Sequence, residues 1–270
     1  MTKSQVIEMQ LDAKGSGEPL VLVGGGLTGW ASWVPHQQRL AGAREVIRAQ
    51  PVAVQYGLDD ATLPAGYSIR LESTALAAAL AARGLAKPLD VVAWSYGAAI
   101  SLDFALEHPE RIRTLTLIEP PAIWVLGATG MLDPQAARES DELRALYASM
   151  TGDVSEAQLA AFARQAGLVP PGKAPEQLPP WPSWVEHRRS LKTGDATWLH
   201  HDDAARLRRF DRPVLLVKGT GSSHFLHQII DGLAATLPRA TVIELPGGHA
   251  PQLVAMDDFL ARLAEFQARR

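Results

Sequence analysis

The amino-acid sequence predicts a doubly wound α/β fold, a mostly parallel sheet with helices on both faces. Short apolar runs, most of them β-branched, alternate along the 270 residues with Ala-rich stretches of helical length. This alternation is typical of the fold class, since parallel strands are joined by crossover helices and buried on both faces. The composition, 47% hydrophobic and 20% charged, is that of an ordinary globular protein that can bury a sizeable core.

Seven apolar runs are predicted as strands. They are Val6–Met9, Leu20–Val23, Val46–Ala49, Val91–Trp94, Leu115–Ile118, Val214–Val217 and Val242–Leu245. The clearest helices between them are Leu71–Arg83 and Ala98–Glu107. The second ends at His108 because the following proline pushes that residue out of the helical region.

No convincing strand occurs between about Pro120 and Phe210. Two amphipathic helices are predicted there, the second behind a capping box at Ser155 and Gln158. Their apolar faces comprise Leu143, Leu146, Tyr147 and Met150 in the first, and Leu159, Phe162, Ala163 and Ala166 in the second. We interpret residues 121–204 as a helical lid, and residues 1–120 and 205–270 as the core. The lid contains four of the seven tryptophans, which either line a pocket or form the lid's own core: Trp124, Trp181, Trp184 and Trp198.

Charge and composition exclude several classes of protein. The 26 basic and 29 acidic side chains leave a net charge of −3, which gives no electrostatic case for nucleic acid or an anionic membrane as partner. The absence of cysteine excludes disulfides, thiolate zinc sites and cysteine nucleophiles. The N-terminus has no apolar core of signal-peptide length, and no apolar run reaches the roughly 18 residues of a membrane span. We therefore expect a soluble, cytoplasmic protein.

The most informative segment is residues 89–99, in which a buried strand leads directly into a helix with Ser95 at the junction. Small residues, Ala93 and Gly97, stand two positions before and after the serine. A strained strand–turn–helix needs this spacing, because bulk on either side would clash where the helix crosses the strand. Ser95 is therefore predicted to be a nucleophile, next to a helix N-terminus that favours developing negative charge. The alternative is a serine that only caps the helix.

Around Ser95 the sequence resembles the α/β-hydrolase family, and the resemblance covers nearly the whole chain. Residues 94–97 resemble the nucleophile elbow, with alanine in place of its usual first glycine. Residues 108–112, 117–121 and 246–249 resemble the end of the following helix, the strand that leads into the lid, and the loop of the catalytic histidine. The resemblance implies an eight-stranded, mostly parallel sheet with the lid inserted after the sixth strand.

A serine nucleophile needs a base and two donors for the oxyanion. Of the eight histidines, His249 is best placed as the base, because it follows a predicted strand in a glycine-rich loop. The backbone N–H of Tyr96, directly after the nucleophile, is one expected donor. The resemblance places the other at Gly26, with Gly25 as the next choice.

The usual acid of the family is missing. Most relatives carry an Asp about three residues past a glycine after the seventh strand, whereas here Gly219 is followed by no carboxylate before Asp231. We favour Glu119 at the end of the sixth strand, because a subset of the family carries its acid there and the order nucleophile, acid, base is kept. A pocket or lid-hinge residue is the alternative for Glu119, and Asp202 and Asp203 are weaker candidates for the acid.

A second motif competes for the loop at residues 24–29. Its sequence, GGGLTG after a strand, fits the G-x-G-x-x-G fingerprint of dinucleotide sites. The next strand ends at Gln50 without the acidic residue that a ribose hydroxyl needs, so we predict no cofactor. We also predict no metal site, because residues 200–203 are contiguous and are expected to form a solvated loop.

Together these features predict a serine hydrolase that cleaves a small, largely apolar ester, thioester or lactone through an acyl-enzyme on Ser95. We expect Gly25, Trp94 and Trp124 to contact the substrate. A serine nucleophile disfavours haloalkane dehalogenase and epoxide hydrolase chemistry, which use a carboxylate in this family. Two alternatives stay open: a non-hydrolytic enzyme of the same fold, such as a lyase or a haloperoxidase-like protein, and a ligand-binding protein with slow turnover.

Overall fold

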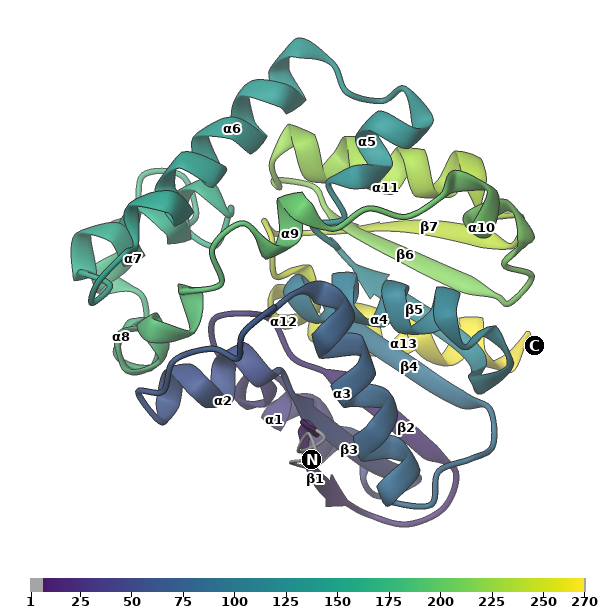
Figure 1. Ribbon diagram of the computed structural model, residues 1–270. Coiled ribbons are helices and arrows are strands. Elements are labelled where there is room, and N and C mark those ends of the chain that lie inside the picture. The colour runs from purple at the N-terminus through teal and green to yellow at the C-terminus, as the bar shows by residue number, and fades with distance from the viewer. Residues whose placement is uncertain (1–6, 270) are drawn as a thin grey trace, which may run out of the picture.

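The computed structural model describes residues 7–269, which contain one seven-stranded sheet (Figure 1). The strand order is β1-β3-β2-β4-β5-β6-β7, with β1 antiparallel to β3 and all other pairs parallel. The strands are β1 (Gln10–Lys14), β2 (Pro19–Val23), β3 (Glu45–Gln50), β4 (Leu89–Trp94), β5 (Ile112–Ile118), β6 (Val214–Gly219) and β7 (Ala240–Leu245).

The prediction of eight strands is wrong for the described residues, and the difference lies at the N-terminal edge. Val6 is outside the described residues, and residues 7–9 form no strand. The N–H of Met9 donates instead to the carbonyl of Ala75, in the helix α3 (Ile69–Ala82), at 3.3 Å. One antiparallel strand, β1, therefore precedes the parallel strands within residues 7–269. The other six predicted strands are confirmed, each somewhat longer than predicted.

Helices cover both faces of the sheet. One face is covered by α3, α4 (Tyr96–Glu107) and α11 (His224–Thr236), and the other by α1 (Val34–Leu40) and α13 (Met256–Ala268). Two shorter α-helices and two 3₁₀ helices complete this part of the chain: α2 (Val52–Leu58), α12 (Pro251–Val254), η1 (Trp30–Trp33) and η2 (Pro109–Arg111).

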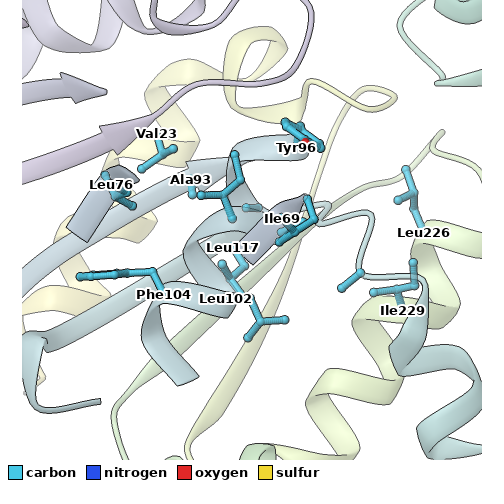
Figure 2. Close-up of a cluster of buried hydrophobic side chains, with 14 of the residues drawn as sticks. Val23, Ile69, Leu76, Ala93, Tyr96, Leu102, Phe104, Leu117, Leu226 and Ile229 are labelled. Carbon is cyan, nitrogen blue, oxygen red and sulfur yellow. The ribbon is translucent and has the colours of Figure 1, made fainter. Parts of the chain in front are cut away.

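The two faces of the sheet carry separate apolar cores, because successive side chains of a strand point to opposite faces. In β2, Val23 belongs to the larger core under α3, α4 and α11, and Leu22 belongs to the smaller core under α13. Figure 2 shows part of the larger core, where Ala93 of β4, Leu117 of β5 and Phe104 of α4 gather with Val23. These side chains are buried, so the sheet is a rigid support for the loops at its edge.

The carboxyl ends of β2 and β4 form a topological switch point. From β2 the chain turns to β3 on one side, and it returns to β4 on the other side of β2. Connections that leave neighbouring strands in opposite directions open a crevice at this edge of a sheet. The glycine-rich loop at residues 24–29 follows β2, and Ser95 follows β4, so both reach the crevice.

The segment between β5 and β6 is helical, and we call residues 121–204 the insertion. Its helices are α5 (Trp124–Thr129), α6 (Pro134–Ser149), α7 (Glu156–Gln165), η3 (Pro175–Gln177), α8 (Trp181–His187), η4 (Arg188–Leu191) and α9 (Ala196–Leu199), and α10 (Ala204–Arg209) leads on to β6. The capping box of Ser155 and Gln158 is present at the start of α7. In Figure 1, α6, α7 and α8 lie to the left of the sheet, beyond its carboxyl edge. Among the described helices, none is long and apolar enough to cross a membrane.

Candidate active site

Ser95 lies at the tip of β4 in a backbone conformation that is strained for any residue except glycine. Its φ is +54° and its ψ is −125°. Its N–H donates to the carbonyl of Ile118 in β5 at 2.9 Å, so the sheet fixes its position. Gly97 permits the sharp turn, because a Cβ at that residue would lie 2.3 Å from the carbonyl oxygen of Gly24.

Ser95, His249 and Glu119 form a hydrogen-bonded chain. The Ser95 hydroxyl donates to His249 Nε2 at 2.7 Å, and His249 Nδ1–H donates to Glu119 Oε2 at 2.8 Å. Glu119 is 0% exposed and His249 is 5% exposed. In this tautomer the imidazole can accept the serine proton, and the carboxylate can stabilise the resulting imidazolium.

The Glu119 carboxylate is held by donors from the end of β6 and the loop after it. The N–H of Gly219 donates to Oε1 at 2.7 Å, and the Ser222 hydroxyl donates to Oε2 at 2.5 Å. The backbone N–H of Glu119 donates to the carbonyl of Val217 in β6 at 3.1 Å. Like Ser95, Glu119 has a positive φ, of +46°. The loop after β6 thus supplies a hydroxyl to a glutamate that directly follows the neighbouring strand β5.

Asp202 and Asp203, the weaker candidates for the acid, have other partners. Asp202 pairs with Arg206 at 3.0 Å, and the Asp203 side chain accepts the Ala205 N–H at the start of α10. The segment His200–Asp203, predicted as a solvated loop, is a loop in which His201 and Asp203 are exposed and His200 and Asp202 are partly buried. His200 Nε2 lies 3.3 Å from a carboxylate oxygen of the buried Asp103 in α4. Within residues 7–269, no group of three or more His, Asp or Glu side chains could hold a metal ion.

The two residues expected to supply backbone N–H groups, Gly26 and Tyr96, both line the crevice beside Ser95. Tyr96 is the first residue of α4, so its N–H has no acceptor within the helix. A Cβ on Gly26 would lie 3.1 Å from the Tyr96 Cβ, which places the two residues in contact. For the Gly26 N–H, no acceptor lies within the part of the chain that the structure describes. The glycine run continues into η1, a single 3₁₀ turn, rather than into a long helix of the dinucleotide-binding type.

The Tyr96 side chain is fixed by a buried polar network. Its hydroxyl and that of Tyr67 lie 2.6 Å apart, and Tyr67 donates to Glu72 Oε1 at 2.6 Å. The same carboxylate accepts the N–H groups of Val52 and Ala53 at the start of α2. Burial raises the pKa of Glu72 to about 6 and the pKa of Tyr96 well above its usual value. The residue that follows Ser95 is therefore held on its backbone side by α4 and on its side-chain side by α2 and α3.

A cavity of about 50 Å³ lies next to Ser95 and His249. Residues 25–27 and 94–96 form its floor. The insertion covers it with Tyr147, Phe162 and Trp198, three aromatic rings in contact: Tyr147 lies 5.8 Å from Phe162 and 5.5 Å from Trp198 between centroids. Apart from His249, no ionisable acid or base other than tyrosine lines the cavity among the described residues. The cavity is thus largely apolar, and its polar side chains are those of the hydrogen-bonded chain, Thr197, Tyr96 and Tyr147.

This sheet, elbow and histidine loop are matched by a known family. Residues 20–263 fit the sequence profile described as the alpha/beta hydrolase family. The chain belongs to that family.

Several relatives of this alpha/beta hydrolase are enzymes with named substrates. It is 36% identical over 115 residues to 2-hydroxy-6-oxo-2,4-heptadienoate hydrolase of Pseudomonas putida, a match to 42% of this chain and 41% of that protein. It is 27% identical over 184 residues to pimeloyl-[acyl-carrier protein] methyl ester esterase of Nitrosomonas europaea, covering 63% and 68% of the two chains. The match to the first relative thus spans well under half of its length.

Solved structures share the fold of this alpha/beta hydrolase over almost its whole length. An esterase from Rhodococcus sp. ECU1013 has a TM-score of 0.76 and 21% identity, covering 96% of this chain and 94% of the other. A protein titled putative non-heme bromoperoxidase, from Mycobacterium tuberculosis, has a TM-score of 0.74 and 19% identity, covering 100% and 98%. At these identities the likeness shows the fold.

Of the three residues expected to contact substrate in this alpha/beta hydrolase, two line the cavity and one does not. Gly25 and Trp94 line the cavity. Trp124 does not, because it begins α5 and is buried in the larger core. Trp181 and Trp184 also form part of that core, so Trp198 is the one tryptophan of the insertion among the lining residues.

Sequence reasoning missed the cavity residues supplied by the insertion and by α11. Tyr147 and Phe162 were placed on apolar helix faces, but nothing in the pattern showed that these faces meet above Ser95. Phe225 and Leu226 of α11 also line the cavity. Their position directly after the loop that holds Ser222 is the signal that could have indicated them.

Proposed function

We propose that this alpha/beta hydrolase is a serine esterase that cleaves a small, largely apolar ester through an acyl-enzyme on Ser95. The observation that carries the proposal is the continuous chain from Ser95 Oγ to His249 to Glu119, with distances of 2.7 and 2.8 Å. A hydroxyl, an imidazole and a buried carboxylate in this order are the groups that acyl transfer requires.

In the proposed mechanism, Ser95 Oγ attacks the ester carbonyl carbon while its proton passes to His249 Nε2. The negative charge that forms on the carbonyl oxygen is stabilised by the N–H groups of Gly26 and Tyr96. Glu119 stabilises the imidazolium, which then protonates the departing alkoxide. Water attacks the acyl-enzyme by the same route, with His249 as its base, and releases the acid and free Ser95.

The size and polarity of the cavity support a short acyl group without charge. Its volume of about 50 Å³ is well below the roughly 150 Å³ that accommodates a benzene ring. A substrate carboxylate would lie in this apolar space without a cationic partner, which is unfavourable. A carboxylate-bearing substrate, such as the name of the Pseudomonas relative indicates, therefore fits this cavity less well than a neutral ester.

The first prediction tests the nucleophile. The Ser95→Ala variant should fold normally and lose at least about 10³-fold in hydrolysis of p-nitrophenyl acetate, because no hydroxyl remains to form the acyl-enzyme. Labelling with a fluorophosphonate should occur in the wild type and be absent in the variant. The control is Ser149→Ala, which removes an exposed hydroxyl of α6. Near-normal hydrolysis by Ser95→Ala would reject the serine mechanism.

A panel of p-nitrophenyl esters of rising acyl length tests the substrate class. We expect acetyl and propionyl esters to be preferred over octanoyl esters, since only a few carbon atoms fit the cavity. If fluorophosphonate fails to label Ser95 and no ester turns over, the ligand-binding alternative is supported. Halide oxidation or lyase activity without ester hydrolysis would instead support a non-hydrolytic enzyme of this fold.

A further inference from the structure

The backbone of His249 is held from two sides by segments far away in the chain. Its N–H donates to the carbonyl oxygen of Gly167, in the insertion, at 2.9 Å. Its own carbonyl accepts the indole N–H of Trp94, the residue before Ser95, at 2.6 Å. Both polar backbone groups of the histidine are thus satisfied from outside its own loop.

The acceptor at Gly167 lies in a closed turn at the end of α7. Leu168 N–H donates back to the carbonyl of Ala163 at 2.9 Å, and Gly167 N–H donates to that of Arg164 at 3.0 Å. Gly167 has a φ of +72°, which glycine adopts without strain. The side chain of Leu168 packs against both apolar cores. The turn is therefore anchored, and its carbonyl is a fixed acceptor.

The contact between the turn and the histidine loop is close. A Cβ on Gly248 would lie 2.1 Å from the Gly167 carbonyl oxygen, and a Cβ on Gly167 would lie 3.5 Å from the His249 nitrogen. The histidine loop includes Gly247, with a φ of +118°, and Gly248. Glycine increases the number of conformations open to a loop, so this loop depends on outside contacts to fix the imidazole.

We propose that the turn at residues 166–168 is a positioning element for His249, so that docking of the insertion on the core completes the catalytic chain. This rests on the proposed role of His249 as the base. A displacement of the insertion that uncovers the cavity also removes the acceptor of the His249 N–H. The imidazole then loses its fixed distance to Ser95, and a misplacement of about 1 Å costs on the order of 10²-fold in rate. The insertion thus controls turnover as well as the shape of the cavity.

The decisive variant is Gly248→Ala. Gly248 has no positive φ, so alanine fits its backbone, and the nearest conflict is with the Gly167 carbonyl. We expect kcat for p-nitrophenyl acetate to fall about 10²-fold, with KM changed less than about threefold, because the base and not the acyl pocket is disturbed. The matched control is Gly152→Ala, a glycine of the insertion at which a Cβ meets nothing within 4 Å.

A measurement that needs no turnover accompanies the kinetics. Hydrogen exchange of the His249 amide should be slow in the wild type and at least about 10²-fold faster in Gly248→Ala. The amides of Ser95 and Glu119, which donate within the sheet, should stay protected in both. If Gly248→Ala does not fold, Gly167→Ala replaces it, since its nearest contact is 3.5 Å away and its main effect is strain at the turn.

The outcomes separate this proposal from the proposed function. Unchanged exchange of the His249 amide together with unchanged kcat in the variant would overturn the positioning role. An equal fall of kcat in Gly152→Ala would overturn it as well. If the wild type hydrolyses no ester, the proposed function fails, whereas faster exchange at His249 in Gly248→Ala still supports positioning by the insertion.

Discussion

The carboxylate of Glu119 is held by three donors at the carboxyl edge of the sheet. It accepts from the backbone of Gly219, the hydroxyl of Ser222 and the imidazole of His249, and it is fully buried. Hydrogen bonds to an ionised carboxylate are about twice as strong as those between neutral groups. At the residue scale, these contacts therefore hold the proposed acid in a fixed position directly behind the imidazole.

The second prediction concerns Glu119→Gln. The amide keeps the size of the side chain but cannot stabilise the imidazolium, so kcat should fall by roughly 10²–10⁴-fold with a smaller change in KM. Steady-state kinetics on p-nitrophenyl acetate measure both. A loss of kcat below about tenfold would show that Glu119 only lines the site. In Glu119→Gln, the added change Ser222→Asp should restore part of kcat, because residue 222 already contacts the position of the acid.

Local spacing in the sequence was enough to predict Ser95 as the nucleophile and His249 as the base. A strand–turn–helix and a glycine-rich loop are both patterns of neighbouring residues, so they can be recognised without the fold. For Glu119, the sequence left two interpretations open, the acid and a pocket or lid-hinge residue. In the structure its carboxylate lies 2.8 Å from the imidazole of His249. No feature of the sequence indicated a role for Gly167. Its role is that of a backbone carbonyl, which every residue has, and its partner lies 82 positions further along the chain.

At the scale of elements, α1 is fastened to the segment that follows His249. His36 of α1 is fully buried between the rings of Trp33 and Phe259, and its Nε2 lies 3.0 Å from the carbonyl oxygen of Gln252 in α12. Burial lowers the pKa of His36 to about 4. The helix packing on this face thus requires a neutral histidine.

The third prediction follows from this pKa. Because the folded-state pKa lies below the unfolded value of 6.5, the stability that neutral His36 contributes is present above pH 6.5 and is lost as the pH falls towards 4. The difference corresponds to about 3 kcal/mol in the free energy of unfolding. His36→Gln should flatten the dependence of that free energy on pH in this range, as measured by urea titration.

Burial of Glu72 changes the free energy of unfolding with pH in the opposite direction. Its pKa of about 6 lies above its ordinary value of 4.5, so its protonation stabilises the fold as the pH falls from about 6 to 4.5. Below about pH 6, the free energy of unfolding of the wild type therefore reflects two opposing effects: protonation of His36 lowers it, and protonation of Glu72 raises it. If His36→Gln left the slope unchanged, titration of His36 would not be the cause of acid unfolding.

Helices and strands were predicted where their pattern is local. The six confirmed strands are short apolar runs, and α6 and α7 were found from their apolar faces and the capping box. The sequence could not show how the insertion folds over the sheet, because contacts such as that of Leu168 with both cores depend on the packing of distant segments. The first strand was misplaced for the same reason: residues 7–9 are apolar enough for a strand, but Met9 bonds to α3 instead.

At the scale of the whole molecule, one end of the sheet carries the proposed catalytic residues and the other carries a buried ion-pair network. Asp90, near the start of β4, lies at the end opposite to Ser95 and is fully buried. It pairs with Arg44 and Arg113, each at 2.7 Å. Burial acts to raise the pKa of Asp90, but hydrogen bonds from Arg113, Thr114 and Arg44 outweigh it and hold the pKa below its usual value. This ion-pair network joins β4, β5 and the segment before β3.

The fourth prediction separates stability from activity. Asp90→Ala removes the shared partner of two arginines and should lower the free energy of unfolding by about 3 kcal/mol. Because the catalytic edge is untouched, kcat measured well below the melting temperature should stay within about twofold of the wild type. Asp211→Ala, at an exposed carboxylate, serves as the control and should change neither quantity. A parallel loss of kcat in Asp90→Ala would show that the two ends of the sheet are coupled.

With its acid at the tip of β5, the molecule carries two of its three proposed catalytic residues on adjacent strands of a rigid sheet. The loop after β6 keeps a single hydroxyl contact, from Ser222, in place of a charged side chain. That loop therefore supplies no acid, and it leads into α11, which borders the cavity with Phe225 and Leu226. Changes in the length or sequence of this loop can then alter which acyl groups are accepted, while the residues of the proton pathway stay the same. New substrate specificity can therefore arise at this loop.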